Sequence, residues 1–191
     1  MIEIKNLVKN YGTKYALDDI SFSVKKGEIV GFLGPNGAGK STTMNILTGY
    51  LSSTSGEAKV GGIDILENPG EAKKLIGFLP EQPPLYVDMT VNEYLNFVYE
   101  IKNCKLNREA HIAEVRQVTK IDDVKNRLIK NLSKGYRQRV GIAQALIGNP
   151  PVIIFDEPTV GLDPKQIIEI RNLIRNLGQT HTVILSTHIL S

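Results

Sequence analysis

A short glycine-rich segment has the residue types and the spacing that hold phosphate groups. It consists of Gly34, Pro35, Asn36, Gly37, Ala38, Gly39, Lys40 and Ser41, and it fits the pattern G-x-x-x-x-G-K-[ST]. Glycines let backbone N–H groups turn towards a phosphate, and a helix that starts at the end of the loop adds the positive end of its dipole. Lys40 is predicted to reach the β and γ phosphates, Ser41 to ligate Mg²⁺, and Thr42 to add a hydroxyl. A glycine-rich turn of no special purpose fits poorly, because the segment lies between a predicted strand and a predicted helix.

Two consecutive carboxylates, Asp156 and Glu157, follow the apolar run of residues 153–155. A carboxylate at the end of a strand beside a phosphate loop is well placed to hold Mg²⁺, which is the role predicted for Asp156. Glu157 would then orient and deprotonate the water that attacks the γ phosphate, so the pair favours hydrolysis. The alternative is that Glu157 only caps the turn at Pro158.

A third segment points to a function only when its position relative to other motifs is considered. Residues 132–139 read LSKGYRQR and precede an apolar helical stretch. Taken alone, they predict only a helix start with Ser133 as the capping residue. They stand before the two carboxylates, which are followed by GLD over residues 161–163 and by His188 just past the last apolar run.

The composition limits the class of protein. The chain has 191 residues, of which 41% are hydrophobic and 23% charged, so it can form one α/β core and has no signature of disorder. The net charge of +3 is modest and the basic residues are scattered, which gives no argument for nucleic acid. The single Cys104 excludes an intrachain disulfide and fits a reducing compartment. The amino terminus does not read as a signal peptide, and no apolar stretch approaches the ~20 residues that span a bilayer. A membrane role must therefore come through a partner chain.

Short apolar runs alternating with helical patterns predict a buried, mainly parallel sheet. The expected strands of this sheet include 28–33, 151–155 and 182–185, and the expected helices are 41–50 and 164–177. Antiparallel strands are expected over 2–9, 20–24 and 56–60, joined by turns such as 25–27.

The middle of the chain, residues 90–131, turns largely helical. Its apolar faces consist of Val91, Tyr94, Leu95 and Val98 on one helix and Ile112, Val115 and Val118 on another. This region is expected to form a helical lobe inserted into the core. His111 and His181 have no motif around them, and we assign them to a helix surface and a turn.

The order of GPNGAGKS, LSKGY, IIFDEP, GLD and STH resembles the nucleotide-binding domain of ATP-binding cassette (ABC) proteins, over the whole chain. The resemblance implies an α/β fold: a P-loop NTPase core with a mainly parallel sheet, an antiparallel β subdomain near the N-terminus and an inserted helical lobe. We expect one ABC ATP-binding domain over residues 1–191. The lobe would take residues 90–148, approximately, and the core residues 1–89 and 149–191. The family domain normally continues past Ser191, so the chain is expected to be truncated.

The resemblance also implies roles for residues outside the phosphate loop. Two such domains would pair head to tail and bury two ATP molecules, with Ser133 and Gly135 of one covering the γ phosphate held by Lys40 of the other. Tyr11 would stack on adenine, Asp163 would communicate across the dimer, and His188 would contact the γ phosphate. From residue type alone, Tyr11 as a turn aromatic and His188 as a surface histidine stay open.

Two departures from the family pattern stand out. Most members have Gln at the end of the strand before the helical lobe, whereas this chain has Glu81 there and Gln82 one residue later. Either side-chain oxygen can reach Mg²⁺ or its water. The signature reads LSKGY in place of the commoner LSGGQ, so Lys134 brings a cation to the expected γ-phosphate position or points to solvent. Both variants look like the branch of exporter subunits with separate membrane proteins, the ABC-2-like type.

The function expected from these features is Mg²⁺-dependent ATP hydrolysis that powers transport. The expected partners are a transmembrane permease subunit and a second nucleotide-binding domain, in a homodimer or heterodimer at the cytoplasmic face of the membrane, with no nucleic acid. The alternative is a soluble ABC ATPase that acts on ribosomes or DNA, although such relatives usually carry two cassettes, iron–sulphur cysteines or a long coiled coil. A small-molecule kinase would not explain LSKGY, GLD and STH.

Overall fold

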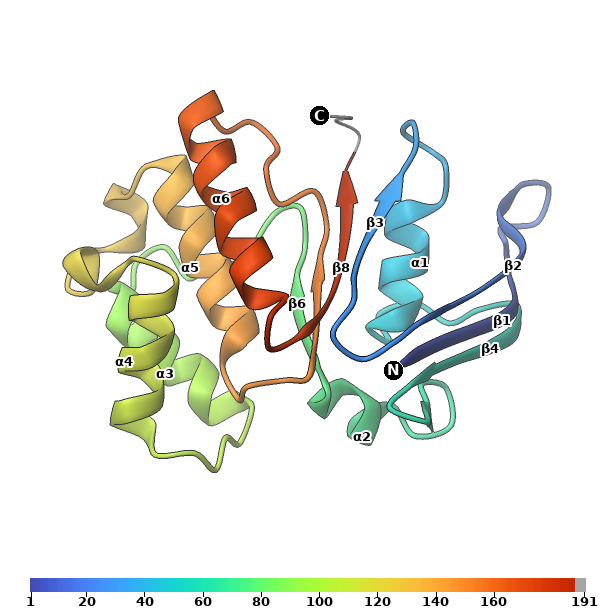
Figure 1. Ribbon diagram of the computed structural model, residues 1–191, viewed down its shortest axis with the longest axis horizontal. Helices are drawn as coiled ribbons and strands as arrows, with labels where there is room; N and C mark the ends of the chain where they lie inside the picture. Colours follow the sequence, from blue (N-terminus) through green and yellow to red (C-terminus); the bar gives the residue numbers. More distant parts are fainter. Residues whose placement is uncertain (188–191) are drawn as a thin grey trace.

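Two four-stranded β-sheets organise the chain in the computed structural model, which describes residues 1–187 (Figure 1). The antiparallel sheet has the order β2-β1-β4-β5 and consists of β1 (Ile2–Asn10), β2 (Tyr15–Val24), β4 (Ser55–Val60) and β5 (Ile63–Asp64). The parallel sheet has the order β3-β8-β7-β6 and consists of β3 (Ile29–Leu33), β6 (Ile76–Leu79), β7 (Val152–Phe155) and β8 (Thr182–Thr187). The predicted combination of a parallel core sheet and an antiparallel sheet near the N-terminus is confirmed.

The helices lie between the strands along the chain, and several of them begin after a residue that caps a helix start. They are α1 (Lys40–Leu47), α2 (Pro69–Lys74), α3 (Val91–Ile101), α4 (Arg108–Val118), α5 (Lys134–Leu146) and α6 (Pro164–Leu177), with short 3₁₀ turns at Asp122–Val124 and Ile129–Asn131. The side chains of Thr90, Asn107, Ser133 and Asp163 each accept a backbone N–H of the first turn that follows. These bonds satisfy donors that a helix leaves unpaired at its start. None of the helices within residues 1–187 is both long and apolar enough to cross a membrane.

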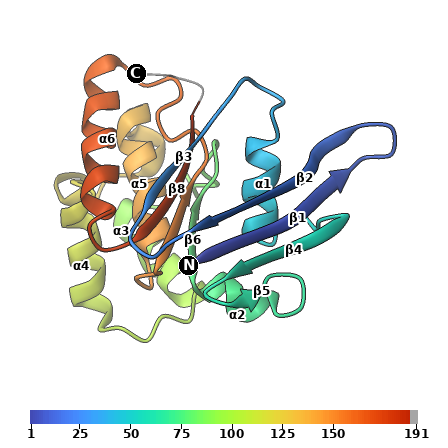
Figure 2. The same cartoon turned by 45° about the vertical axis from the view of Figure 1, so that its right-hand side comes forward.

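The parallel sheet separates two apolar cores. Val152 and Ile154 of β7 pack with α1 and the antiparallel sheet, whereas Ile153 and Phe155 pack with the helices α3 to α6. This division follows from the alternation of side chains along a strand. Figure 2 shows α1 between the two sheets and α5 and α6 on the opposite face of the parallel sheet. Strand β7 is therefore buried on both faces, as its unbroken apolar sequence indicates.

Most expected elements are present, with differences at their ends. The helix over 164–177 is confirmed at both ends, and the expected helix 41–50 ends at Leu47, before Gly49 at a φ of 65°. The expected strand 20–24 starts earlier, at Tyr15. The turn at residues 25–27 does not join two antiparallel strands, because it leads from β2 to β3 in the other sheet. The polar residues predicted a turn correctly, but the turn connects the two sheets and does not form a hairpin.

Two side chains differ from their expected exposure. Val118, at the end of α4, is 41% exposed because the helix packs only one stripe of its surface. The expectation that His111 lies on a helix surface is wrong: it is 7% exposed, and its Nε2 accepts a hydrogen bond from the N–H of Gly148 at 3.0 Å. His181 lies as expected, in the turn between α6 and β8.

Helix α5 crosses β6 at very short range. A Cβ added to Gly77 would lie 2.1 Å from the carbonyl oxygen of Ala145, so only glycine allows this approach. The end of α5 is also held by Lys102, whose Nζ donates to the carbonyls of Gln144 and Ile147, both at 2.9 Å. Burial of this ammonium lowers the pKa of Lys102 to about 8. The contacts fix α5 against the strand that leads to Glu81.

Candidate functional site

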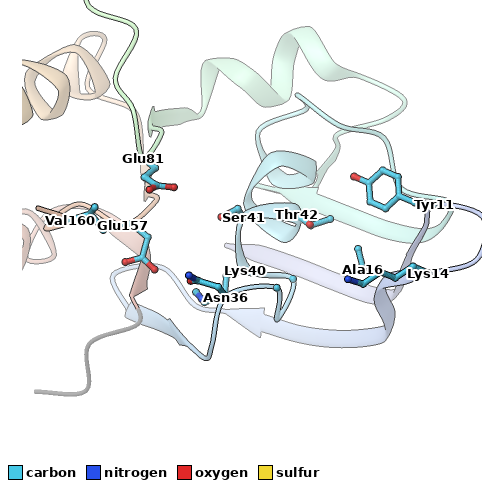
Figure 3. A pocket seen from close by; sticks show the side chains of 12 residues that line it. Tyr11, Lys14, Ala16, Asn36, Lys40, Ser41, Thr42, Glu81, Glu157 and Val160 are labelled. Atoms are coloured by element: carbon cyan, nitrogen blue, oxygen red, sulfur yellow. The ribbon is translucent and has the colours of Figure 1, made fainter.

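A cleft of about 620 Å³ lies where the glycine-rich loop meets the ends of β6 and β7. Its lining residues are Tyr11, Lys14, Ala16, Asn36, Gly37, Gly39, Lys40, Ser41, Thr42, Glu81, Glu157 and Val160. Figure 3 shows Tyr11 and Lys14 at one end, Glu81 and Glu157 at the other, and Lys40 and Ser41 between them. The cleft is therefore elongated, with an aromatic end and an acidic end on either side of the loop.

The loop presents backbone N–H groups because helix α1 starts without a side-chain cap. Its N-cap is Gly39, at a φ of 87° that favours glycine. A Cβ at Gly39 would also lie 2.6 Å from the carbonyl oxygen of Ala16, so two independent constraints require glycine. The first N–H groups of a helix have no partner within it, and this gives the loop an anion-binding character.

Lys40 lies folded over the loop that precedes it. Its Nζ donates to the carbonyl oxygens of Gly34 at 2.7 Å and Pro35 at 3.1 Å. The ammonium is thus held at the cleft, close to the N–H groups of the helix start. An anion that enters the loop would meet a fixed positive charge as well as backbone donors.

The two carboxylates stand at the end of β7 in different surroundings. Asp156 is 6% exposed, and its Oδ1 accepts hydrogen bonds from Ser41 Oγ at 3.2 Å and Ser186 Oγ at 2.5 Å. Glu157 is 8% exposed, lines the cleft, and has a φ of 48°, which is uncommon for a residue other than glycine. Sparsely populated backbone conformations of this kind cluster at functional sites.

The donor set beside Ser41 fits a small divalent cation. One carboxylate and one hydroxyl lie together, and residues 1–187 contain no group of three or more His, Cys, Asp or Glu side chains that could form a protein cage. Mg²⁺ is usually bound through one or two such side chains together with phosphates and water. Asp156 and Ser41 therefore suit Mg²⁺ delivered with a phosphate ligand.

The structure brings together many of the residues that the sequence singles out. Tyr11, Asn36, Gly37, Gly39, Lys40, Ser41, Thr42, Glu81 and Glu157 share the cleft, while Gly34, Pro35 and Ala38 complete the loop beside it. Gln82 lines a neighbouring hollow with Lys134 and Gln138, whereas Glu81 lines both this hollow and the cleft. His188 lies outside the described residues.

Ser133 and Gly135 stand apart from the cleft, at the start of α5. Ser133 caps that helix as predicted, although its bond from Tyr136 N is long at 3.4 Å. A Cβ added to Gly135 would lie 2.6 Å from the side chain of Gln166, which gives this glycine a packing role within its own chain.

Sequence reasoning missed Lys14 and Ser186. Lys14 lines the cleft because its carbonyl accepts a hydrogen bond from Tyr11 N at 2.9 Å in the turn between β1 and β2. The only signal for it was its closeness to Tyr11. Ser186 begins the STH motif, but the motif pointed to its histidine and not to the buried serine.

Comparison with known proteins agrees with this geometry. The sequence profile described as ABC transporter matches residues 17–160. A bacitracin transport ATP-binding protein from Bacillus licheniformis is 38% identical over 193 residues, which cover 100% of this chain and 62% of that protein. A lantibiotic transport ATP-binding protein from Streptococcus pyogenes is 37% identical, with 100% of this chain and 81% of that protein covered. The chain thus spans about three fifths of the first relative.

Solved structures show the same fold. A dimeric ATP-binding cassette in a post-hydrolysis state, bound to ADP and Pi, has a TM-score of 0.86 and 32% identity, over 99% of this chain and 88% of that one. A subunit of an ABC transporter complex from Clostridium perfringens has a TM-score of 0.86 and 29% identity, over 98% of this chain and 78% of that one. The profile match, the relatives and the fold lead to one conclusion: this chain belongs to the ABC transporter family.

Proposed function

We propose that this chain binds ATP together with Mg²⁺ in the cleft and hydrolyses it to ADP and phosphate. The observation that carries the proposal is the meeting of the glycine-rich loop with the two carboxylates, where Asp156 accepts from Ser41 and Glu157 lines the same cleft as Lys40. A phosphate loop alone accounts for binding. The second carboxylate adds a group that can act on water.

Each residue has a distinct chemical role in this proposal. The N–H groups of the loop and Lys40 bind the β and γ phosphates and stabilise the charge that develops on them, while Thr42 adds a hydroxyl. Ser41 and Asp156 hold Mg²⁺, which neutralises phosphate charge when bound. Glu157 orients the attacking water and accepts its proton. Tyr11, 59% exposed at the far end of the cleft, offers its ring face to adenine.

The position that most family members fill with Gln is assigned here to Glu81. Glu81 is among the residues that line the cleft and Gln82 is not, which supports Glu81 as the residue that reaches Mg²⁺ or its water. His188 is proposed to contact the γ phosphate, on the resemblance of STH to the family motif.

We further propose that the chain is the energy-coupling part of a transporter. Relatives named as transport ATP-binding proteins support this, as does the dimeric cassette with ADP and Pi. Two copies, or this chain and a similar one, would pair so that Ser133 and Gly135 close over the ATP of the other. A separate permease would hold the pair at the cytoplasmic face of the membrane, docked on a helical lobe of approximately residues 90–148.

The test separates ATP binding from hydrolysis. Glu157→Gln is expected to keep the parent's affinity for MgATP and to lower steady-state hydrolysis by at least ~10²-fold, the usual scale for a general base. Glu71→Gln is the matched control, since Glu71 is an exposed glutamate on α2 that pairs with Lys74. Turnover of Glu157→Gln close to that of the parent would remove Glu157 from the role. A parent that neither binds nor hydrolyses MgATP would refute the function.

A further inference from the structure

The hydroxyl of Ser186 links the carboxylate of Asp156 to the backbone N–H of Glu157. Ser186 lies on β8, is 0% exposed, and is not among the residues that line the cleft. Its Oγ accepts a hydrogen bond from the backbone N–H of Glu157 at 2.9 Å and donates one to Asp156 Oδ1 at 2.5 Å. A backbone N–H can only donate, so the single hydroxyl proton must go to the carboxylate. The direction of both bonds is therefore fixed.

This arrangement follows from the register of the parallel sheet. Phe155 of β7 pairs with Leu185 of β8, so the residues that follow them, Asp156 and Ser186, come side by side at the carboxyl ends of the parallel strands. Serine suits the position because it is small enough for full burial and has both a donor and an acceptor. Alanine would fit the space and would remove both hydrogen bonds.

The two bonds act on different parts of the site. The bond from Glu157 N holds a peptide whose φ of 48° is strained for a residue with a side chain, and it thereby restrains the backbone from which the Glu157 carboxylate extends. The bond to Asp156 restrains the carboxylate that Ser41 also approaches. Because the Ser41 hydroxyl donates its hydrogen bond to Asp156, its oxygen lone pairs are available to another ligand.

We propose that Ser186 is a positioning residue that sets both carboxylates for ATP hydrolysis. The inference rests on the proposed function for its catalytic consequence. Ser186 does not touch the substrate. It keeps the Glu157 backbone in its strained conformation and the Asp156 carboxylate in one orientation, and a displacement of about 1 Å in a catalytic group is enough to lower a rate by about 10²-fold.

The experiment compares Ser186→Ala with Ser186→Thr, which keeps the hydroxyl, and with Thr182→Val. Thr182 is the matched control, because it is a 1% exposed hydroxyl on the same strand whose Oγ1 accepts from Gly27 N at 3.0 Å, away from the carboxylates. The first readout is hydrogen exchange at the Glu157 amide in protein without nucleotide. Ser186→Ala should raise this exchange rate by about tenfold, the equivalent of one net hydrogen bond, and Thr182→Val should not.

The second readout is MgATP binding and hydrolysis by the same proteins. Ser186→Ala should lower kcat by about 10-fold to 10²-fold with the Kd for MgATP changed by less than about threefold, and Ser186→Thr should restore most of kcat. An unchanged Glu157 exchange rate, or an equal loss of kcat in Thr182→Val at a similar melting temperature, would overturn the proposal. If the parent does not hydrolyse ATP, the proposed function fails, and the exchange readout still decides whether Ser186 holds Glu157.

Discussion

The contact between β6 and α5 can be tested by adding one methyl group. In Gly77→Ala the new Cβ would lie 2.1 Å from Ala145 O, 2.9 Å from Ala145 C and 2.9 Å from Pro150 Cγ, whereas ordinary contacts begin at 3.4 Å. Relief requires a movement of more than 1 Å between two backbones. Overpacking usually costs about 1–3 kcal/mol. We expect the upper end, about 3 kcal/mol, because α5 cannot easily move away.

The reason is that α5 is held against β6 from several sides. Gln144 Nε2 donates to the carbonyl of Phe78 at 3.0 Å, and Lys102 and His111 hold the helix end and the turn that follows it. For a domain of this size each kcal/mol lowers the melting temperature by roughly 2–4 °C, so Gly77→Ala should lose about 6–12 °C in a thermal scan.

The matched control is the same substitution in open space. A Cβ added to Gly70, on α2, meets nothing within 4 Å, and the φ of Gly70 is not positive. Gly70→Ala should therefore stabilise the protein by about 0.5–1 kcal/mol, as glycine loses more freedom on folding than alanine. A Gly77→Ala protein that melts within about 2 °C of the parent would show that α5 is not pinned and would refute this account.

Two further predictions concern a titratable and a charged residue. Burial lowers the pKa of His111 below 6.5, and its Nε2 accepts a hydrogen bond from Gly148 N. The stability that the neutral imidazole contributes is therefore present above about pH 6.5 and is lost as the pH falls. In urea titrations of the parent, the free energy of unfolding should fall by up to ~1.4 kcal/mol per pH unit below that point. His111→Gln, which keeps an acceptor but does not titrate, should show a smaller loss. Lys134→Gly in the Glu157→Gln background should weaken ATP-driven dimerisation and its salt dependence in light scattering. An unchanged dimerisation constant would show that Lys134 does not act across the dimer. Its contact would then be the one within its own chain, where a Cβ added to Gly161 would lie 2.0 Å from Lys134 Nζ.

Local chemistry made the phosphate loop and the carboxylate pair predictable. The spacing of glycines before Lys40 has few other uses, and Gly39 indeed combines a φ of 87° with a close approach to Ala16. The run of apolar residues before Asp156 correctly predicts a strand buried on both faces. In each case the requirement is set within a few residues, so the sequence alone contains it.

Features that depend on distant pairing were not predictable. Whether Glu81 or Gln82 lines the cleft depends on the register between β6 and β7. The local sequence does not specify that register. Ser186 gains its role only because Phe155 pairs with Leu185. His111 is buried by the turn at Gly148, which is far away in the sequence, and an amphipathic pattern cannot reveal a polar residue enclosed in this way.

The cleft carries its cationic and carboxylate groups in positions that already suit a phosphate ligand. Lys40 donates to two neutral carbonyls, and a phosphate oxygen would offer the ammonium an opposite charge in their place, so an exchange of partners would be favourable. Ser41 and Asp156 lie at hydrogen-bond distance, and Ser186 restrains Asp156 from the other side. Because backbone contacts set the glycine conformations and the helix start, and the hydroxyls of Ser41 and Ser186 restrain the Asp156 carboxylate, little conformational entropy is left to lose on binding. In the proposed function, binding energy would then be available to bring Glu157 and water into line with the γ phosphate.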